Sequence, residues 1–351
     1  MTQRKRTTLG HVPQRKRTTL RELAESVGVH TSTVSRVMNP KTRHLIGDDV
    51  VDKVLSTAIQ LNFSANRNAA TLRTNCSCII GVVLPDIANQ VFPPILRGIE
   101  DELAKKGFIP LIANAEGGTE RQRFVIDQMV GRQVDGLILA TSGRDDPILE
   151  HCLEVGIPVV VVNRSEDSGR ASCVVSDNQL AMLQAVTHLV KIGHTAIAHV
   201  AGPSDLSTGY ERRLGFLDAI REKGLKKTQC PVAESKAFSR DEGCAACDML
   251  LELHPGITSI VAANDLLALG CYDSIRARGL RCPQDISVVG HNDMPLMDSV
   301  APPMTTVRIP LYEMGVRAAI LMLENLDGGT KANVNIVLRP ELVVRESTIA
   351  R

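Results

Sequence analysis

The sequence predicts a small all-α head containing a helix-turn-helix, followed by an α/β body of two doubly wound parallel-sheet lobes. Three observations lead to this fold class. Apolar residues recur at helical spacing in three short segments of residues 18–64. From Cys76 onward, short β-branched runs alternate with amphipathic helical segments, which is typical of parallel strands buried on both faces. Residues 76–351 are numerous enough for two such sheets with a cleft between them.

The charge distribution separates the head from the body. Residues 1–75 hold 13 Lys/Arg and 5 Asp/Glu, whereas the remainder holds 27 and 34, although the net charge of the chain is only +1. A basic head on an acidic body suggests a polyanionic partner for the head. A solvated basic tail without a partner is the alternative interpretation of the charge alone.

The head begins with two helices joined by a glycine-bearing turn. Thr19 is a good N-cap for a helix over residues 20–27, and Gly28 suits the turn that ends it. A second helix spans residues 31–38, with its valines facing inward and short polar groups facing outward. A third helix over residues 48–62 can complete a small core. The outward face of the second helix is suited to approach base edges in the major groove of DNA.

These motifs resemble the DNA-binding head of the lactose-repressor/galactose-repressor (LacI/GalR) family. The resemblance is carried by TLRELAESVGVHTSTVSRVMN and by VVDKVLSTAIQLNFSANRNAATLR, in that order and spacing. It implies DNA contacts from residues of the head and of a following hinge: Thr19, Thr31, Ser32, Thr33, Ser35, Arg36, Asn39, Asn66, Ala69, Leu72 and Arg73.

Several of these positions have an implied role in the family. Thr31 and Ser32 match the positions that set operator preference, and Arg36 matches a base-reading position suited to guanine. Leu72 matches the hinge leucine that wedges into the minor groove. His30 departs from the pattern, because the family has Ser or Thr as the N-cap there. An imidazole is expected to cap poorly, so His30 either weakens the helix start or contacts DNA.

The chain opens with QRKRTTL twice, at residues 3–9 and 14–20. Only the second copy adjoins the first helix and supplies its cap. Residues 1–17 are expected to form a disordered basic tail that adds nonspecific, salt-sensitive attraction to phosphates. The alternative is a specific minor-groove arm. Residues 65–75, the hinge, form a polar segment that is only marginally helical on its own and is suited to fold when paired on DNA.

The body, residues 76–351, continues the resemblance through AGP, AND, DISVVG and PPMTTV. This core is similar to periplasmic sugar-binding proteins. The resemblance implies crossings between lobes near residues 175, 307 and 338. Lobe one then comprises about 76–175 and 308–337, and lobe two about 176–307 and 338–351.

A ligand is expected at the carboxyl ends of the parallel strands, where the crevice lies. Residues that follow predicted strands are therefore candidates: Asp86, Ser142, Asn163, Asn264 and Asn292. The family resemblance adds Phe92, Thr208, Arg212 and Phe238, of which Arg212, at a helix start, is the strongest candidate. Each also has a structural interpretation, because the phenylalanines can be core residues and asparagine at a strand end is often a turn former.

The chemistry of these candidates favours an anionic ligand. Many sugar-binding members carry aspartates where this chain has Asn163 and Asn292. Arg212 is expected near these amides, and Arg164 is a second cation that can lie nearby. A sugar acid or other small anionic metabolite is therefore expected, with neutral sugars as the alternative.

The sequence as a whole predicts a ligand-responsive, sequence-specific transcriptional regulator. We expect a repressor of a catabolic or sugar/sugar-acid operon, acting in the cytoplasm as a homodimer on a pseudo-palindromic operator in double-stranded DNA. A small-molecule effector, no cofactor, no metal and no membrane span are expected. An enzyme is disfavoured, since the sequence has no G-x-S-x-G, P-loop or paired metal motif. The alternative is a cytoplasmic solute-binding or sensor protein without a specific operator.

Overall fold

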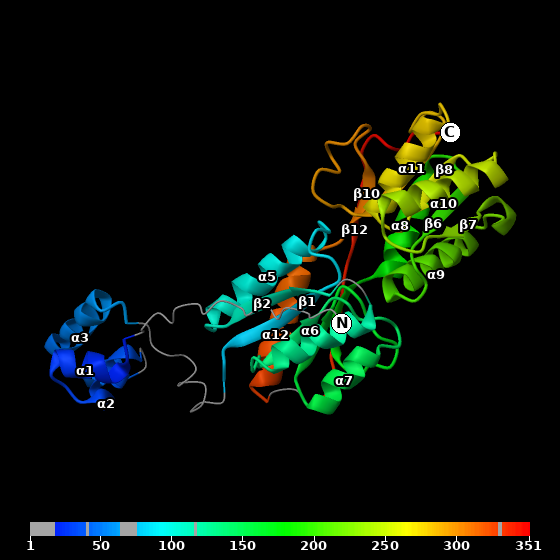
Figure 1. Cartoon of the computed structure of the whole chain (residues 1–351). Helices are drawn as coiled ribbons and strands as arrows, with labels where there is room; N and C mark the ends of the chain where they lie inside the picture. The colour runs from blue at the N-terminus through cyan, green and yellow to red at the C-terminus, as the bar shows by residue number, and fades with distance from the viewer. Residues whose placement is uncertain (1–17, 40–41, 64–75, 116–117, 329–331) are drawn as a thin grey trace, which may run out of the picture. The chain divides into compact units, whose positions relative to one another are not determined.

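The structure is a computed structural model that describes residues 18–39, 42–63, 76–115, 118–328 and 332–351. The chain divides into two compact units, Met1–Ser77 and Cys78–Arg351. Figure 1 shows the helices and strands of both units, coloured from blue at the N-terminus to red at the C-terminus. The predicted fold class is confirmed, with an all-α head followed by two parallel-sheet lobes. Within the described residues, no helix has the length and apolar character needed to cross a membrane.

The first unit holds the helix-turn-helix and a third helix: α1 (Leu20–Val27), α2 (Thr31–Met38), the short 3-10 helix η1 (Arg43–Leu45) and α3 (Asp48–Gln60). Thr19 caps α1 through a reciprocal capping box, in which the Glu22 amide donates to Thr19 Oγ1 at 3.2 Å and the Thr19 amide donates to Glu22 Oε2 at 2.7 Å. Gly28 ends α1 with φ of 79°, as the turn requires. The core of this unit consists of small and branched side chains: Leu23, Ala24, Val27, Val34, Val37, Val51, Val54 and Ala58.

The first lobe of the second unit is built on a six-stranded parallel sheet with the order β11-β5-β4-β3-β1-β2. Its strands are β1 (Ile79–Leu84), β2 (Ile109–Asn114), β3 (Gly136–Leu139), β4 (Val159–Val162), β5 (Ser172–Ser176) and β11 (Asn335–Leu338). Helices α5 (Phe92–Lys105) and α12 (Leu311–Leu326) pack together and against this sheet, as do α6 (Thr119–Val130) and α7 (Pro147–Val155). Alternate strand residues belong to two different cores, so both faces of the sheet are covered.

The second lobe has a six-stranded sheet with the order β12-β10-β9-β8-β6-β7. Its strands are β6 (Ile197–Ala201), β7 (Val232–Glu234), β8 (Ser259–Ala262), β9 (Ser287–Asn292), β10 (Thr305–Arg308) and β12 (Glu341–Val343), of which β12 alone runs antiparallel to its neighbour. Its helices are α8 (Asn178–Lys191), α9 (Ser207–Glu222), α10 (Arg240–Leu253) and α11 (Asp265–Ala277), with η2 (Lys227–Gln229) between α9 and β7.

Neither lobe is a continuous stretch of chain. The chain passes from the first sheet to the second after β5, returns after β10, and crosses again between β11 and β12. These crossings lie close to the predicted positions 175, 307 and 338. The helix α12 and the strand β11 therefore complete the first lobe from the far end of the sequence (Figure 1).

Helices α5 and α12 approach each other at two glycines. A Cβ atom on Gly98 would overlap the carbonyl oxygen of Tyr312 and lie 2.9 Å from the amide nitrogen of Val316. A Cβ atom on Gly315 would overlap the carbonyl oxygen of Ile95. The backbones of the two helices are therefore in direct contact, which fixes how α12 lies in the first lobe.

Candidate DNA-reading surface and effector cleft

The second helix of the helix-turn-helix, α2, presents a short polar face to solvent. Val34 and Val37 are buried in the core of the first unit, whereas Ser32 and Arg36 are exposed, one helical turn apart. The other predicted DNA contacts of α2, which are Thr31, Thr33 and Ser35, are partly exposed, and so is Asn39, the C-cap residue. Short polar side chains around one exposed arginine are suited to approach base edges and phosphates in the major groove.

Side-chain hydrogen bonds to the backbone hold the helices of the head together. The hydroxyl of Thr18 donates to the carbonyl of Leu61 at 2.9 Å and ties the start of α1 to the end of α3. The guanidinium of Arg43 donates to the carbonyl of Val37 at 2.8 Å. Thr19, a predicted DNA contact, is exposed while its side chain serves in the capping box.

Four predicted hinge contacts lie outside the described residues, as does the first QRKRTTL copy. Asn66, Ala69, Leu72 and Arg73 therefore stay predictions from the family resemblance. The same holds for the alternative of a minor-groove arm within residues 1–17.

His30 is the N-cap of α2, and it makes a side-chain cap despite the expectation that an imidazole caps poorly. Its Nδ1 atom accepts a hydrogen bond from the amide of Ser32 at 3.3 Å and lies 2.8 Å from Ser32 Oγ. The expectation overlooked that a neutral imidazole offers one in-plane lone pair, which reaches the second amide of the helix when the cap residue is extended.

The second unit contains a cavity of about 290 Å³, which residues from both lobes line. Most of the residues predicted from strand ends or from the family line it: Asp86, Phe92, Asn163, Thr208, Arg212, Phe238, Asn264 and Asn292. Arg164, which the sequence analysis added as a further cation, lines it too. Ser142 does not line it, although its side chain is fully buried. The strand-end rule thus brings the predicted residues together at one crevice, with Ser142 as the exception.

Arg212 is a buried cation of this cavity whose side chain is held by two hydrogen bonds. It lies in the second turn of α9, which begins at Ser207 rather than close to Arg212 as the sequence suggested, and its side chain is buried. Its Nε atom donates to Asn178 Oδ1 at 2.8 Å, and Nη1 donates to the carbonyl of Ala263 at 2.7 Å. Burial lowers the pKa of Arg212 to about 9, so the guanidinium is still charged at neutral pH.

A second arginine shares the cavity. Arg164 donates to the carbonyl of Thr141 at 3.2 Å. Burial lowers its pKa to about 10, with nearby Asp205 and Asp146 acting in the opposite direction. The charge of Arg164 also contributes to the lowered pKa of Arg212. Two cations that repel each other in a partly enclosed site are stabilised when an anion binds between them.

The two strand-end asparagines have left-handed backbones, with φ of 67° at Asn163 and 117° at Asn292. Asparagine tolerates this region better than most residues, so both asparagines serve as turn formers while they line the cavity. The Oδ1 atom of Asn292 is buried and has no hydrogen-bond partner within the part of the chain that the structure describes. A ligand hydroxyl or bound water would satisfy it.

Phe92 and Phe238 are predicted either as ligand contacts or as core residues, and the structure places both at the cavity and at the core. Phe92 begins α5 and is 3% exposed, within the large core cluster. Phe238 packs against the same cluster and lies 6.0 Å from the Arg212 guanidinium, measured to the ring centroid. Both rings line the cavity and also belong to the core.

A chain of hydrogen bonds connects the first lobe to Arg212. The hydroxyl of Ser165, on the loop after β4, donates to Glu211 Oε1 at 3.0 Å. The other carboxylate oxygen of Glu211 accepts from Asn178 Nδ2 at 2.7 Å, and Asn178 in turn accepts from Arg212. The Ser165 amide also donates to Ser207 Oγ at 2.9 Å. The orientation of the Arg212 guanidinium is therefore linked, through these hydrogen bonds, to the contact between the lobes.

A further contact between the lobes lies next to this chain of hydrogen bonds. The guanidinium of Arg144 lies 3.6 Å from the ring centroid of Tyr210 and is held in place by Asp167, whose Oδ2 is 2.8 Å from Arg144 Nη2.

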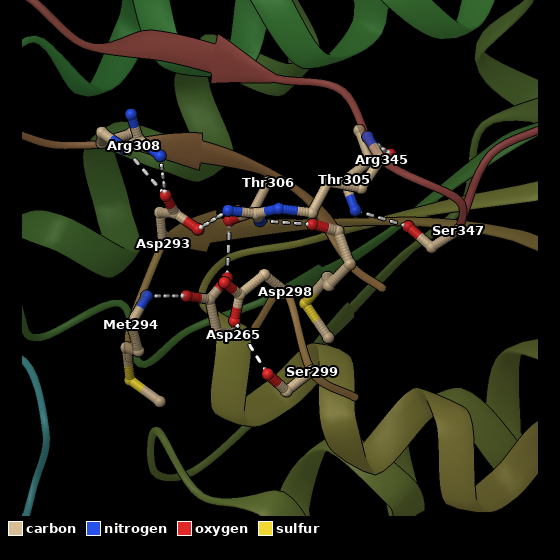
Figure 2. Close-up of polar contacts among 11 residues, drawn as sticks. Asp265, Asp293, Met294, Asp298, Ser299, Thr305, Thr306, Arg308, Arg345 and Ser347 are labelled. Atoms are coloured by element: carbon tan, nitrogen blue, oxygen red, sulfur yellow. Dashed lines mark hydrogen bonds and ion pairs between the residues drawn. The ribbon is translucent and has the colours of Figure 1, made fainter. Parts of the chain in front are cut away.

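Asp265 and Asp293, which follow the cavity-lining residues Asn264 and Asn292 in the sequence, each join several segments of the second lobe through polar contacts (Figure 2). Asp293, which follows Asn292, pairs with Arg308 at 2.7 Å and with Arg345 at 2.8 Å, so that it joins β10 to the segment after β12. Asp265 is buried at the start of α11, where it accepts from the Thr306 hydroxyl at 2.6 Å and from the Met294 amide at 2.8 Å. Both carboxylates thus hold segments next to the crossings between the lobes.

Asp265 is expected to make stability depend on pH. Burial raises its pKa to about 7, whereas the unfolded chain releases the proton near pH 4. The folded state therefore retains a proton that the unfolded state has lost, and stability falls as pH rises from about 4 to about 7. In Asp265→Asn this contribution, at most about 4 kcal/mol, is expected to disappear. The asparagine side chain of the variant can keep both contacts. Its oxygen can accept from the Met294 backbone amide, and its NH₂ group can donate to the Thr306 hydroxyl, which can donate or accept.

The check is urea unfolding of the wild-type protein and of Asp265→Asn at about pH 4.5, 6 and 7.5, a range that covers the interval between the unfolded-state and the folded-state pKa of Asp265. The stability of the wild type relative to the variant should decrease across this range. Parallel pH profiles would contradict the assignment of the titration to Asp265.

Sequence reasoning missed some residues of the cavity, including Asp205, Leu206 and Lys236. Asp205 and Leu206 follow β6, so the strand-end rule could have found them if it had been applied to the AGP segment. Lys236 follows β7, a strand of three residues that has no recognisable hydrophobic run. No sequence signal would have found Lys236.

Comparison with known proteins agrees with this architecture. The model of a periplasmic binding protein-like domain matches residues 186–348. The HTH-type transcriptional regulator CelR of Thermobifida fusca is 33% identical over 95% of this chain and 99% of its own length. A structure of a CelR–cellobiose complex aligns with a TM-score of 0.72 and 30% identity, covering 94% of this chain and 100% of that chain. A lac repressor dimer bound to operator and an anti-inducer aligns with a TM-score of 0.86 and 26% identity, covering 95% and 100%.

A helix-turn-helix head followed by a two-lobed body with a cleft defines the class of ligand-responsive, DNA-binding transcriptional regulators. The chain belongs to the LacI family of these regulators, as its sequence predicted. Its relatives are transcription regulators and not enzymes.

Proposed function

We propose that the protein is a repressor that binds a pseudo-palindromic operator as a homodimer in the cytoplasm, under the control of a small-molecule effector in the cleft. The exposed polar face of α2 supports the DNA contact, since one head covers about one half-site and two-fold symmetry supplies the other. The structure of a related repressor is of a dimer on its operator. No role for a further cofactor is proposed.

The effector that the cavity supports best is a sugar acid or another small anionic metabolite. The observation that carries this is the pair of arginines, Arg212 and Arg164, whose lowered pKa values reflect buried charge. Lys236 also lines the cavity, so that its basic lining residues are Arg164, Arg212 and Lys236. Its acidic lining residues are Asp86 and Asp205. A carboxylate between the arginines would offset their repulsion and accept charge-assisted hydrogen bonds from them.

A neutral sugar is the second candidate. Cellobiose is the ligand named in the structure of a related regulator, and Asp86 and Asp205 could accept hydrogen bonds from sugar hydroxyls. The aromatic ring of Phe92 is compatible with either class, because a ring can stack on the apolar face of any pyranose.

Isothermal titration of the full chain should distinguish the two classes. Galacturonate and gluconate are the anionic probes, and galactose and cellobiose are the neutral ones. We expect measurable heats with at least one anionic probe and weaker or no binding of both neutral probes. Tight binding to neutral sugars alone would reject the anionic effector while leaving the regulator function intact.

Selection of DNA from random duplexes by the purified full chain tests the operator. We expect a two-fold symmetric motif at moderate ionic strength. The affinity of the protein for this motif should change when a probe that binds the cleft is added. Recovery of no motif, with and without the probes, would reject sequence-specific regulation and favour a sensor that has no operator.

A further inference from the structure

The N-cap of α2 links a histidine to one of the side chains expected to read DNA. His30 Nδ1 lies 2.8 Å from Ser32 Oγ and 3.3 Å from the Ser32 amide nitrogen. Both residues are exposed on the first turn of α2, and Arg36 is exposed one turn further along the same helix. The cap therefore lies on the solvent-facing side of the helix-turn-helix.

Only one arrangement of hydrogens satisfies both contacts. A backbone amide can only donate, so Nδ1 must accept, and the proton of the neutral ring is then on Nε2. The lone pair of Nδ1 lies in the ring plane and is shared by the Ser32 amide and the Ser32 hydroxyl. With its proton directed at His30, the Ser32 hydroxyl has only lone pairs left for a further partner.

We propose that His30 is a specificity-determining residue, which holds the Ser32 hydroxyl as a hydrogen-bond acceptor toward the major groove. The operator strand that faces Ser32 should then carry a base with an amino group, adenine or cytosine, at that position. Adenine N6 and cytosine N4 donate in the major groove, whereas thymine O4 and guanine O6 only accept. This inference rests on the proposed function, because it requires that α2 reads base edges.

The expected size of the effect follows from the hydrogen bond that a keto base would break. To donate to thymine or guanine, the Ser32 hydroxyl must rotate away from His30 and leave Nδ1 with the longer amide contact. The loss of one such bond corresponds to a preference of about 3- to 10-fold for the amino base. The effect should be confined to one position in each half-site.

The experiment is in vitro selection from random duplexes with the full chain and three variants. Ser32→Ala identifies the position that Ser32 reads, because base preference should be lost there alone. His30→Gly removes the acceptor for the hydroxyl and weakens an N-cap only slightly. It should reduce the amino-base preference at that same position to less than about 2-fold, with the other positions unchanged. His30→Asn keeps an acceptor oxygen and should retain the preference.

Three outcomes would overturn the inference: no position responds to Ser32→Ala; that position carries a keto base in the wild type; or His30→Gly keeps the preference. A purely structural cap predicts something different, namely weaker binding of His30→Gly to every sequence with the motif unchanged. Failure of the wild type to select any motif is distinguishable from all of these and would reject the proposed function itself, and the inference with it.

Discussion

Replacing Arg212 with methionine is expected to abolish effector binding while leaving operator binding in place. The guanidinium donates to Asn178 and to the carbonyl of Ala263, and both acceptors lose their donor in the variant. Under the proposed function, the effector also loses a charged partner in the cavity. A charge-assisted hydrogen bond of this kind contributes about 1.5–3 kcal/mol, and the unpaired acceptors add to the loss, so affinity should fall by at least about 100-fold.

The neighbouring Arg213 provides a matched control. Its side chain is 44% exposed and pairs with Glu234 at 3.5 Å. Arg213→Met removes the same charge from the same helix and should change effector affinity by less than about 3-fold. Titration of both variants with whichever probe binds the wild type is the measurement, and thermal unfolding shows whether each is folded. If the two variants lost affinity equally, Arg212 would have no special role in the cavity.

Replacing Gly98 with alanine is expected to cause a large loss of stability. The added methyl group would overlap the carbonyl oxygen of Tyr312 and lie 2.9 Å from the amide nitrogen of Val316. Both are backbone atoms of α12, so no side chain can rotate to make room and the two helices must separate. Overpacking of this kind costs about 3 kcal/mol or more.

Thermal and urea unfolding of Gly98→Ala should therefore show a midpoint lower by several degrees. Gly256→Ala is the control, because a Cβ atom there has no neighbour within 4 Å. It should be close to neutral. A neutral Gly98→Ala would show that α5 and α12 are less closely packed than the structure indicates.

Local signals predicted the elements of the head well. The sequence predicts a helix over residues 31–38 with the bounds that α2 has, because Asn39-Pro40 marks its end and the inward-facing valines mark its helical spacing. The alternation of β-branched runs with amphipathic segments predicted the two lobes, since buried parallel strands need continuous apolar stretches. The short strand β7 was missed because three residues carry no pattern.

The cavity could be predicted from sequence only as far as strand ends and family positions reach. The strand-end rule placed Asn163 and Asn292 at the crevice but failed for Ser142, which is buried and does not line the cavity. The hydrogen bonds from Ser165 through Glu211 to Asn178 join residues far apart in the sequence. Contacts of this kind depend on how two lobes meet, and no local pattern specifies that.

The way in which the first lobe is assembled has a consequence for biosynthesis. β5 acquires its neighbour β11, and α5 its partner α12, only after residues 311–338 have been translated. The helices α1, α2 and α3 of the head, in contrast, lie within about the first sixty residues of the nascent chain. On the ribosome, a DNA-binding module can therefore fold long before the lobe that follows it in the sequence, which must wait with an open sheet edge and a bare helix face until translation is nearly finished.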